Sequence, residues 1–174
     1  MSETSFFEVL FYFPSIIYYI AIFSSCSKVK SLKMKCVREL QFFKNIREVR
    51  EFDFGIFFYF DSLVISEIKD GIVFGWDMAE KAVIAAEEIF GKKQPIAYIS
   101  NRINNYTVAP TDWIKFYTNR NRLSFYSVVG STQGSFASIV LERMFFQNSI
   151  HQFTDLQEAI DFSVAKIQKN KETA

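Results

Sequence analysis

From Val49 onward, apolar residues recur at every second position, which is the spacing of a β-strand with one buried face. The side chains predicted to share that face are Phe52, Phe54, Ile56, Phe58 and Phe60. Asp61 and Ser62 suit a tight turn, and residues 63–69 return as a second strand. The pattern therefore predicts an antiparallel hairpin.

Asp70-Gly71 is the strongest hairpin-turn signal in the chain, and residues 72–74 after it either extend the sheet or lead into a helix. That helix is predicted over residues 76–90. It is expected to end at Gly91, because glycine readily adopts the positive φ that closes a helix. The side chains predicted to form its buried stripe are Ala79, Val83, Ala86 and Phe90.

Short apolar strands and helices alternate through the rest of the chain. The predicted strands are residues 95–100, 123–129 and 150–153. One helix is predicted to start at Pro110, with Asp112 complementing its positive end, and another to span residues 132–146. Thr154 and Gln157 form a capping box that predicts the start of a final helix.

This order of elements predicts an α/β fold. Strands that alternate with helices need right-handed crossovers and a mainly parallel sheet. We expect a mixed sheet of four or five strands, in which an N-terminal antiparallel hairpin is followed by β–α repeats with helices packed against the sheet. No repeat or linker divides residues 45–168, so they are predicted to form one domain, followed by a disordered tail over residues 169–174. A chain that begins near Lys44 is expected to fold alone.

The first forty residues, 1–40, have a different character. Residues 9–27 are uncharged and would span roughly 28 Å as a helix, close to the thickness of a hydrocarbon core. The basic stretch over residues 28–50 would flank such an anchor and keep the following domain on the cytoplasmic face of the membrane. Two alternatives are a lipoprotein-type cleavage site before Cys26 and a true start at Met34.

Composition narrows the functional classes. The net charge of +1 argues against binding of nucleic acid, and two cysteines are too few for a disulfide scaffold, so a reduced, intracellular protein is expected. His151, the single histidine, lies among apolar residues and is predicted to be structural. With no second histidine and no catalytic motif, the sequence predicts neither a metal site, nor a cofactor, nor enzyme activity.

A polar loop after the predicted strand 95–100 is the best candidate site. It would lie at the carboxyl end of a parallel strand, where α/β proteins bind ligands and partners. The candidate binding residues are Ser100, Asn101, Arg102, Asn104, Asn105, Tyr106, Thr107 and Thr111. The alternative is structural, with amides and hydroxyls satisfying the loop backbone and Arg102 resting against Tyr106 or pairing with a surface acid.

Gly130, Ser131 and Thr132 form a weaker candidate site. A strand followed by these three residues and a helix could present backbone N–H groups to an anion. The P-loop ending and the G-x-G-x-x-G spacing are both missing. An ordinary helix N-cap by Ser131 or Thr132 is the favoured interpretation.

Three segments carry a family resemblance: "EIKDGIVFGWDMAEKA", "KKQPIAYISNRINNYTVAPTDW" and "FTDLQEAIDF". Together they make residues 49–167 similar to small STAS-like (SpoIIAA-like) bacterial proteins, often of Bacteroidetes-type origin. The resemblance implies a mixed sheet covered by helices and a non-enzymatic regulatory domain. The best-known STAS proteins are phosphorylated at the start of a helix. The equivalent region here contains Thr107 and Thr111, although the usual Asp-Ser-Ser-Gly type motif is absent.

Two functional hypotheses follow. The first is an intracellular STAS-like regulatory domain that binds an unidentified protein partner through the polar loop. The second is a domain that binds a small ligand, because some STAS-like proteins and the distantly similar CRAL-TRIO domains hold nucleotides or lipids. An association with the membrane would depend on residues 9–27.

Overall fold

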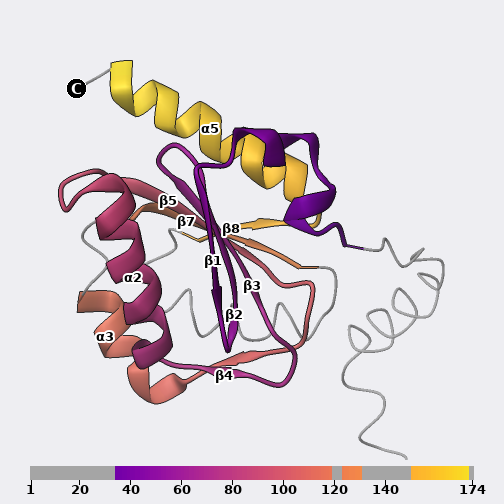
Figure 1. Ribbon diagram of the computed structural model, residues 1–174, viewed down its shortest axis with the longest axis vertical. Coiled ribbons are helices and arrows are strands. Elements are labelled where there is room, and N and C mark those ends of the chain that lie inside the picture. Colours follow the sequence, from indigo (N-terminus) through magenta and orange to yellow (C-terminus); the bar gives the residue numbers. More distant parts are fainter. Residues whose placement is uncertain (1–33, 119–122, 131–149, 173–174) are drawn as a thin grey trace, which may run out of the picture. The chain divides into compact units, whose positions relative to one another are not determined.

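The computed structural model describes residues 34–118, 123–130 and 150–172 (Figure 1). Within them, six strands form a main sheet in the order β1-β2-β3-β5-β7-β8, and β4 and β6 form a small parallel sheet. The strands of the main sheet are β1 (Glu48–Phe52), β2 (Gly55–Tyr59), β3 (Leu63–Ile68), β5 (Ile96–Asn101), β7 (Leu123–Val129) and β8 (Ile150–Phe153). The strands of the small sheet are β4 (Val73–Phe74) and β6 (Thr107–Val108).

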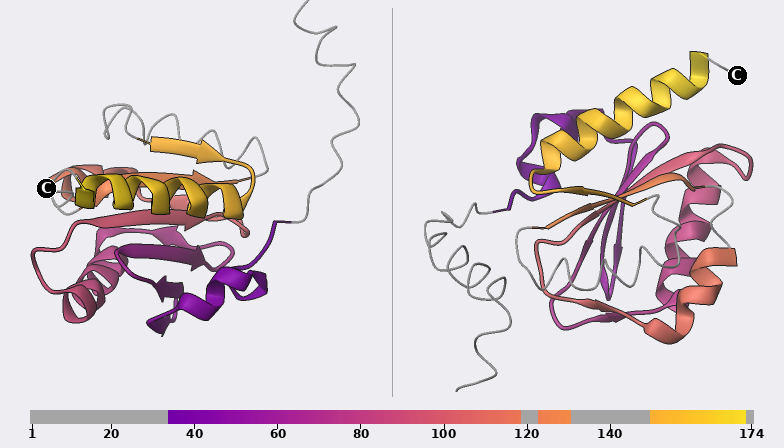
Figure 2. Two further views of the ribbon diagram at one scale, coloured as in Figure 1. Left: turned by 90° about the horizontal axis from the view of Figure 1, so that it is seen from above. Right: turned by 180° about the vertical axis from the view of Figure 1, so that it is seen from behind.

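Helices cover both faces of the main sheet (Figures 1 and 2). One face carries α2 (Trp76–Phe90) and α3 (Trp113–Thr118), which follows the short 3-10 helix η4 (Pro110–Asp112). The other face carries α5 (Leu156–Glu172) with the 3-10 helices η2 (Val37–Glu39) and η3 (Gln41–Asn45). Each face buries its own apolar cluster, so the core has two layers.

The predicted α/β class is confirmed. β1, β2 and β3 are antiparallel neighbours, whereas β3, β5, β7 and β8 run parallel to one another. The two predicted features, an antiparallel start and a parallel continuation, are therefore both present. Over the described residues, the main sheet has six strands rather than four or five, because the first predicted strand is in fact two.

That first strand breaks at Asp53 and Phe54, which form the turn between β1 and β2. Phe54 therefore packs on the α2 side, whereas Phe58 and Phe60 pack on the α5 side. The prediction that these phenylalanines share one face was wrong. Their alternating pattern continued through the turn, because the turn residue Phe54 is itself buried.

Two predicted helix ends can be compared with the structure. The helix predicted over residues 76–90 is α2, and Gly91 closes it with a positive φ of 77°. At the start of α5, Oδ1 of Asp155 accepts hydrogen bonds from the N–H groups of Gln157 and Glu158, at 2.8 and 3.2 Å. Asp155 rather than Thr154 therefore caps this helix.

The packed unit begins earlier than the predicted boundary near residue 45. Val37 is fully buried and Leu40 is 9% exposed, and both belong to the cluster on the α5 side. Phe42 and Phe43 place their rings 4.6 and 6.2 Å from those of Phe60 and Phe58. Residues from Met34 on thus complete this face of the core.

Two predicted segments lie outside the described residues: the uncharged run over residues 9–27 and the helix over residues 132–146. Among the helices that the structure does describe, none combines the length and the apolar character needed to cross a membrane.

Candidate functional site

The predicted polar loop lies at the carboxyl ends of β3 and β5. Ser66 of β3 and Ser100 of β5 are neighbours in the parallel register, and the chain after Asn101 leaves the main sheet to form β6 and η4. In Figure 1 this connection runs from β5 down to the small sheet. The location is the one expected for a binding site in a parallel sheet.

The first two candidate residues face the interior. Ser100 and Asn101 are each 1% exposed. The hydroxyls of Ser100 and Tyr106 share a hydrogen bond of 2.6 Å. Nδ2 of Asn101 donates to the carbonyl oxygen of Lys35 at 3.1 Å and to Oε1 of Glu67 at 2.9 Å. These contacts hold the loop and the N-terminal segment to the sheet and leave neither side chain available to a partner.

Glu67 is a buried carboxylate that is not among the predicted site residues. Its side chain is inside the protein, and Oε1 accepts a hydrogen bond from the N–H of Val37 at 2.7 Å in addition to the bond from Asn101. Burial raises the pKa of Glu67, and these two hydrogen bonds offset part of that rise. Glu67 is the only charged residue of β3, all of which is buried, and this was the signal that could have identified it.

Arg102 is also buried, with 5% of its surface exposed. Its guanidinium carbon lies 5.3 Å from the centroid of the Tyr106 ring, and its backbone N–H donates to Val129 at 2.9 Å. This contact with Tyr106 is the one that the structural interpretation of the arginine predicted. A cation against an aromatic face stabilises the loop from within.

Asn104 and Asn105 attach the loop to the connection between β3 and β4. Nδ2 of Asn104 donates to the carbonyl oxygen of Ile68 at 2.8 Å, and the backbone N–H of Asn105 donates to Asp70 at 3.0 Å. In return, the N–H of Gly71 donates to the carbonyl oxygen of Asn105 at 2.7 Å. The Asp-Gly turn therefore joins the two sheets instead of closing a hairpin.

A small pocket of about 260 Å³ opens between this turn and the loop. The residues that line it are Gly71, Ile72, Arg102, Asn104, Asn105, Tyr106 and Thr107. Its walls are mixed, with amide, guanidinium and hydroxyl groups beside apolar surface. The pocket has room for a small polar molecule but not for a long acyl chain.

The outer part of the candidate segment is exposed. Thr107 and Thr111 both reach the surface. Thr107 pairs with Val73 across the small sheet, and the Val73 residue is 59% exposed. Ile114 in α3 is 70% exposed. Two large apolar side chains thus accompany the two hydroxyls on this part of the molecule.

Asp112 lies in η4, as predicted, but its carboxylate serves a different helix. Oδ2 of Asp112 accepts a hydrogen bond of 2.9 Å from the N–H of Trp76, the first residue of α2. This bond lowers the pKa of Asp112, and nearby Lys115 acts in the same direction. Asp112 therefore fixes η4 and α3 to the start of α2.

The weak anion site has no support from the part of it that the structure describes. The N–H of Gly130 donates to the carbonyl oxygen of Phe153 at 3.1 Å, which continues the ladder between β7 and β8. That donor is consequently used within the fold. Ser131 and Thr132 lie outside the described residues.

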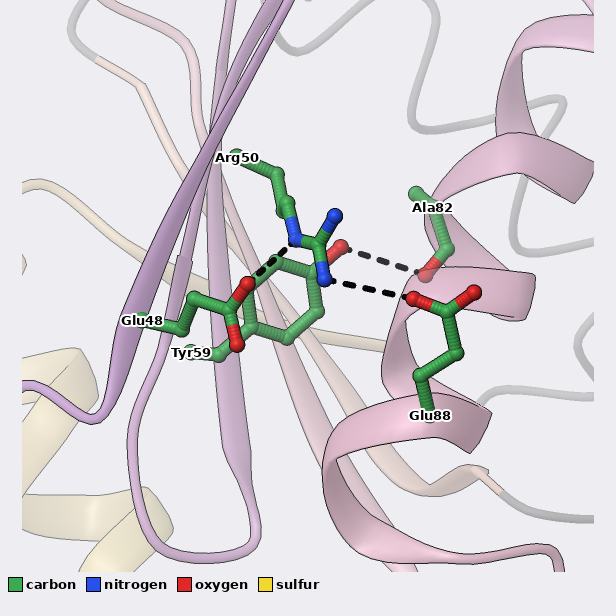
Figure 3. Close-up of polar contacts among 5 residues, drawn as sticks. All are labelled: Glu48, Arg50, Tyr59, Ala82 and Glu88. Atoms are coloured by element: carbon green, nitrogen blue, oxygen red, sulfur yellow. Dashed lines mark hydrogen bonds and ion pairs between the residues drawn. The ribbon is translucent and has the colours of Figure 1, made fainter.

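A second polar cluster, on β1 and α2, was not predicted (Figure 3). Nε of Arg50 lies 2.5 Å from Oε1 of Glu48, and Nη2 lies 3.2 Å from Oε2 of Glu88 on α2. Behind this charged group, the hydroxyl of Tyr59 donates to the carbonyl oxygen of Ala82 at 3.2 Å, and burial raises the pKa of Tyr59. The cluster connects the first edge of the main sheet to α2.

His151 lies on β8 in a structural setting. Its ring centroid is 4.5 Å from that of Phe162 on α5. Partial burial lowers the pKa of His151, and Lys166 lowers it further. Across the described residues, no three His, Cys, Asp or Glu side chains come together in a way that could hold a metal ion.

Comparisons of the chain with protein-family models, with curated proteins and with solved structures found no match. The STAS-like resemblance therefore stays a prediction.

Proposed function

We propose that this chain is a non-enzymatic protein-interaction domain of the STAS-like kind, and that its partner binds the small sheet and the η4–α3 segment. The observation that carries the proposal is the exposure of two large apolar residues there. Val73 is 59% exposed and Ile114 is 70% exposed. An exposed apolar patch with a polar rim is typical of a surface that a protein partner covers.

In this proposal the polar residues of the loop hold the surface in place and do not contact the partner themselves. Asn101 and Arg102 are buried, and Asn104 holds the turn after β3. They fix the path of the chain into β6 and η4, where Thr107 and Thr111 are exposed. The mixed α/β sheet is the architecture that the STAS-like resemblance implies.

The test compares two variants of the full chain. In the first, Val73→Ser and Ile114→Ser remove both apolar side chains from the proposed surface. In the matched control, Ile84→Ser removes a side chain from α2 whose residue is 51% exposed. Affinity capture from a lysate should recover a specific protein with the wild type and the control but lose it with the double variant. Equal recovery with all three proteins would exclude this surface.

Small-ligand binding is a second candidate, and the 260 Å³ pocket beside Arg102 supports it. The mixed walls of the pocket favour a small polar molecule. The phenylalanine-rich core, in contrast, is filled by packed rings, such as those of Phe54 and Phe57, whose centroids lie 6.0 Å apart. Native mass spectrometry of freshly purified protein should then show an added mass. An Asn105→Trp variant, which would narrow the pocket from an exposed position, should lose that mass.

A further inference from the structure

β1 forms one edge of the main sheet. It pairs with β2 on one side, and in the part of the chain that the structure describes no strand pairs with its other side (Figure 2). A strand in this position presents a row of backbone N–H and C=O groups to another chain. Proteins either block such an edge or use it for association.

The sequence of β1 complements itself when one copy is turned antiparallel to another. Residues 47–51 read Arg-Glu-Val-Arg-Glu. Positions at equal distance before and after Val49 therefore carry opposite charges. If two copies pair antiparallel with Val49 opposite Val49, Glu48 of each copy lies opposite Arg50 of the other. Opposite charges in directly facing positions stabilise a pair of strands.

Other nearby registers lack this match. A shift by one residue in one direction brings Arg47 opposite Arg50, and a shift in the other direction brings Glu48 opposite Glu51. Centring the pair on Arg50 or on Glu48 places like charges opposite each other at the symmetry axis. Because like charges in facing positions are unfavourable, the charge pattern selects the register centred on Val49.

The side chains needed for this pairing are accessible at the edge. The side chains of Glu48 and Arg50 are 39% and 41% exposed. Both belong to the cluster that faces α2, so they lie on the same side of the sheet (Figure 3). Arg47 and Glu51 face each other in the same register and also carry opposite charges. Within the chain they contact the carbonyl oxygen of Ile89 and Arg38.

We propose that β1 is the dimerisation strand of this protein, pairing antiparallel with β1 of a second copy in the register centred on Val49. The two main sheets then form one continuous sheet about a two-fold axis. β1 of one copy contacts β1 of the other copy across that axis, and the use of the same surface by both copies is what a closed two-fold dimer requires. Each dimer contains the pair between Glu48 and Arg50 twice.

Charge reversal tests the pairing in the full chain. Glu48→Arg makes both positions positive, and Arg50→Glu makes both negative. Analytical ultracentrifugation should show a dimer for the wild type and a dimer weakened by roughly tenfold or more for each single variant. An equimolar mixture of the two variants should form a heterodimer, because each facing pair is again of opposite sign.

The mixture separates loss of pairing from loss of folding, since an unfolded variant could not associate in a charge-dependent way. The double variant E48R/R50E keeps opposite charges at the facing positions 48 and 50, so it should also dimerise, although it loses the ion pair between Arg50 and Glu88. A monomeric wild type, single variants that dimerise as tightly as the wild type, or a mixture that stays monomeric would each overturn the proposal.

The register has a separate test. In a chain whose Cys26 and Cys36 are replaced by Ser, Val49→Cys places two thiols opposite each other, with their Cβ atoms roughly 5 Å apart. Mild oxidation should then crosslink the dimer. Glu51→Cys in the same background is the control and should crosslink far less. Equal crosslinking at both positions would rule out the register centred on Val49.

Discussion

Oε1 of Glu67 accepts a hydrogen bond of 2.9 Å from Nδ2 of Asn101, although 34 residues separate the two along the chain. The same oxygen accepts the N–H of Val37, and the same amide reaches the carbonyl oxygen of Lys35. Two neighbouring strand ends thus hold one N-terminal segment by its backbone. The polar chemistry that marked the loop in the sequence is mainly used to hold this segment.

Loss of the Asn101 amide should therefore destabilise the protein. Asn101→Ala leaves the carbonyl oxygen of Lys35 without this donor and takes one of two hydrogen bonds from buried Glu67. We expect the free energy of unfolding in urea to fall by about 1–3 kcal/mol. Asn105→Ala is the control and should change it by less than about 0.5 kcal/mol, because Asn105 is exposed and bonds through its backbone. Similar losses in both variants would contradict the structural role of Asn101.

Glu67 should make the protein less stable as the pH rises, which is the opposite of what most carboxylates do. Because burial raises its folded pKa above the ordinary value of 4.5, the folded chain binds a proton more tightly than the unfolded chain does. The cost of the buried charge is absent below pH 4.5 and grows as pH rises through the folded pKa. Glu67→Gln, which keeps an acceptor for Val37, should gain stability relative to the wild type as pH rises through this window.

Unfolding experiments from pH 4 to pH 8 would measure this difference. Glu67→Ala is the contrasting variant, because it also removes the acceptor and should be less stable than Glu67→Gln at every pH. A constant difference between wild type and Glu67→Gln across the range would mean that the pKa of Glu67 is not raised.

Periodicity was sufficient to predict most elements of the fold. The helix over residues 76–90 and the strands near residues 96, 123 and 150 were found because each has a strong apolar pattern. The turn at Asp53 and Phe54 was missed because the alternation of phenylalanines runs through it, although Asp53 and Gly55 on either side of Phe54 are both residues that favour turns. Local pattern cannot show where a strand reverses when the turn residue is buried by contacts far along the chain.

The candidate site was predicted in position but not in detail. The loop does follow a parallel strand, yet which polar side chains point inward depends on partners such as Glu67 and Tyr106, which only the fold brings together. The role of the segment around Val37 was missed for the same reason. Its contacts with β3 are long-range and leave no periodic signal in the sequence.

Gly75 precedes α2 and lies against the carboxylate of Asp112, which caps the start of this helix. A Cβ atom at Gly75 would lie 2.8 Å from Oδ2 of Asp112, which accepts the N–H of Trp76. Gly75→Ala should displace this carboxylate and lower the free energy of unfolding, because the N–H of Trp76 loses its acceptor. It should also return the pKa of Asp112 towards its ordinary value.

A double-mutant cycle with Asp112→Ala would check this explanation. The two changes remove the same interaction, so their combined effect should be smaller than the sum of the single effects. The lowered pKa of Asp112 also fixes how stability depends on pH. The ionised carboxylate stabilises the fold at pH values above 3.8, the ordinary pKa, and this contribution is lost as the pH falls through the lowered pKa of the folded state. Additive effects would argue against a shared cap.

The N-terminal boundary gives the last prediction. The sequence pattern predicted that a chain beginning at Lys44 folds alone, but such a chain lacks Val37 and Leu40, which are 0% and 9% exposed. Losing these two side chains removes roughly 3–6 kcal/mol of the free energy gained by burying apolar surface, which is a large part of the free energy of unfolding of an ordinary domain. We therefore expect thermal unfolding of this chain to be broad and shifted to a much lower temperature. A chain beginning at Lys33 keeps the segment and should unfold cooperatively, and equal melting temperatures for the two chains would show that residues 34–43 do not belong to the core.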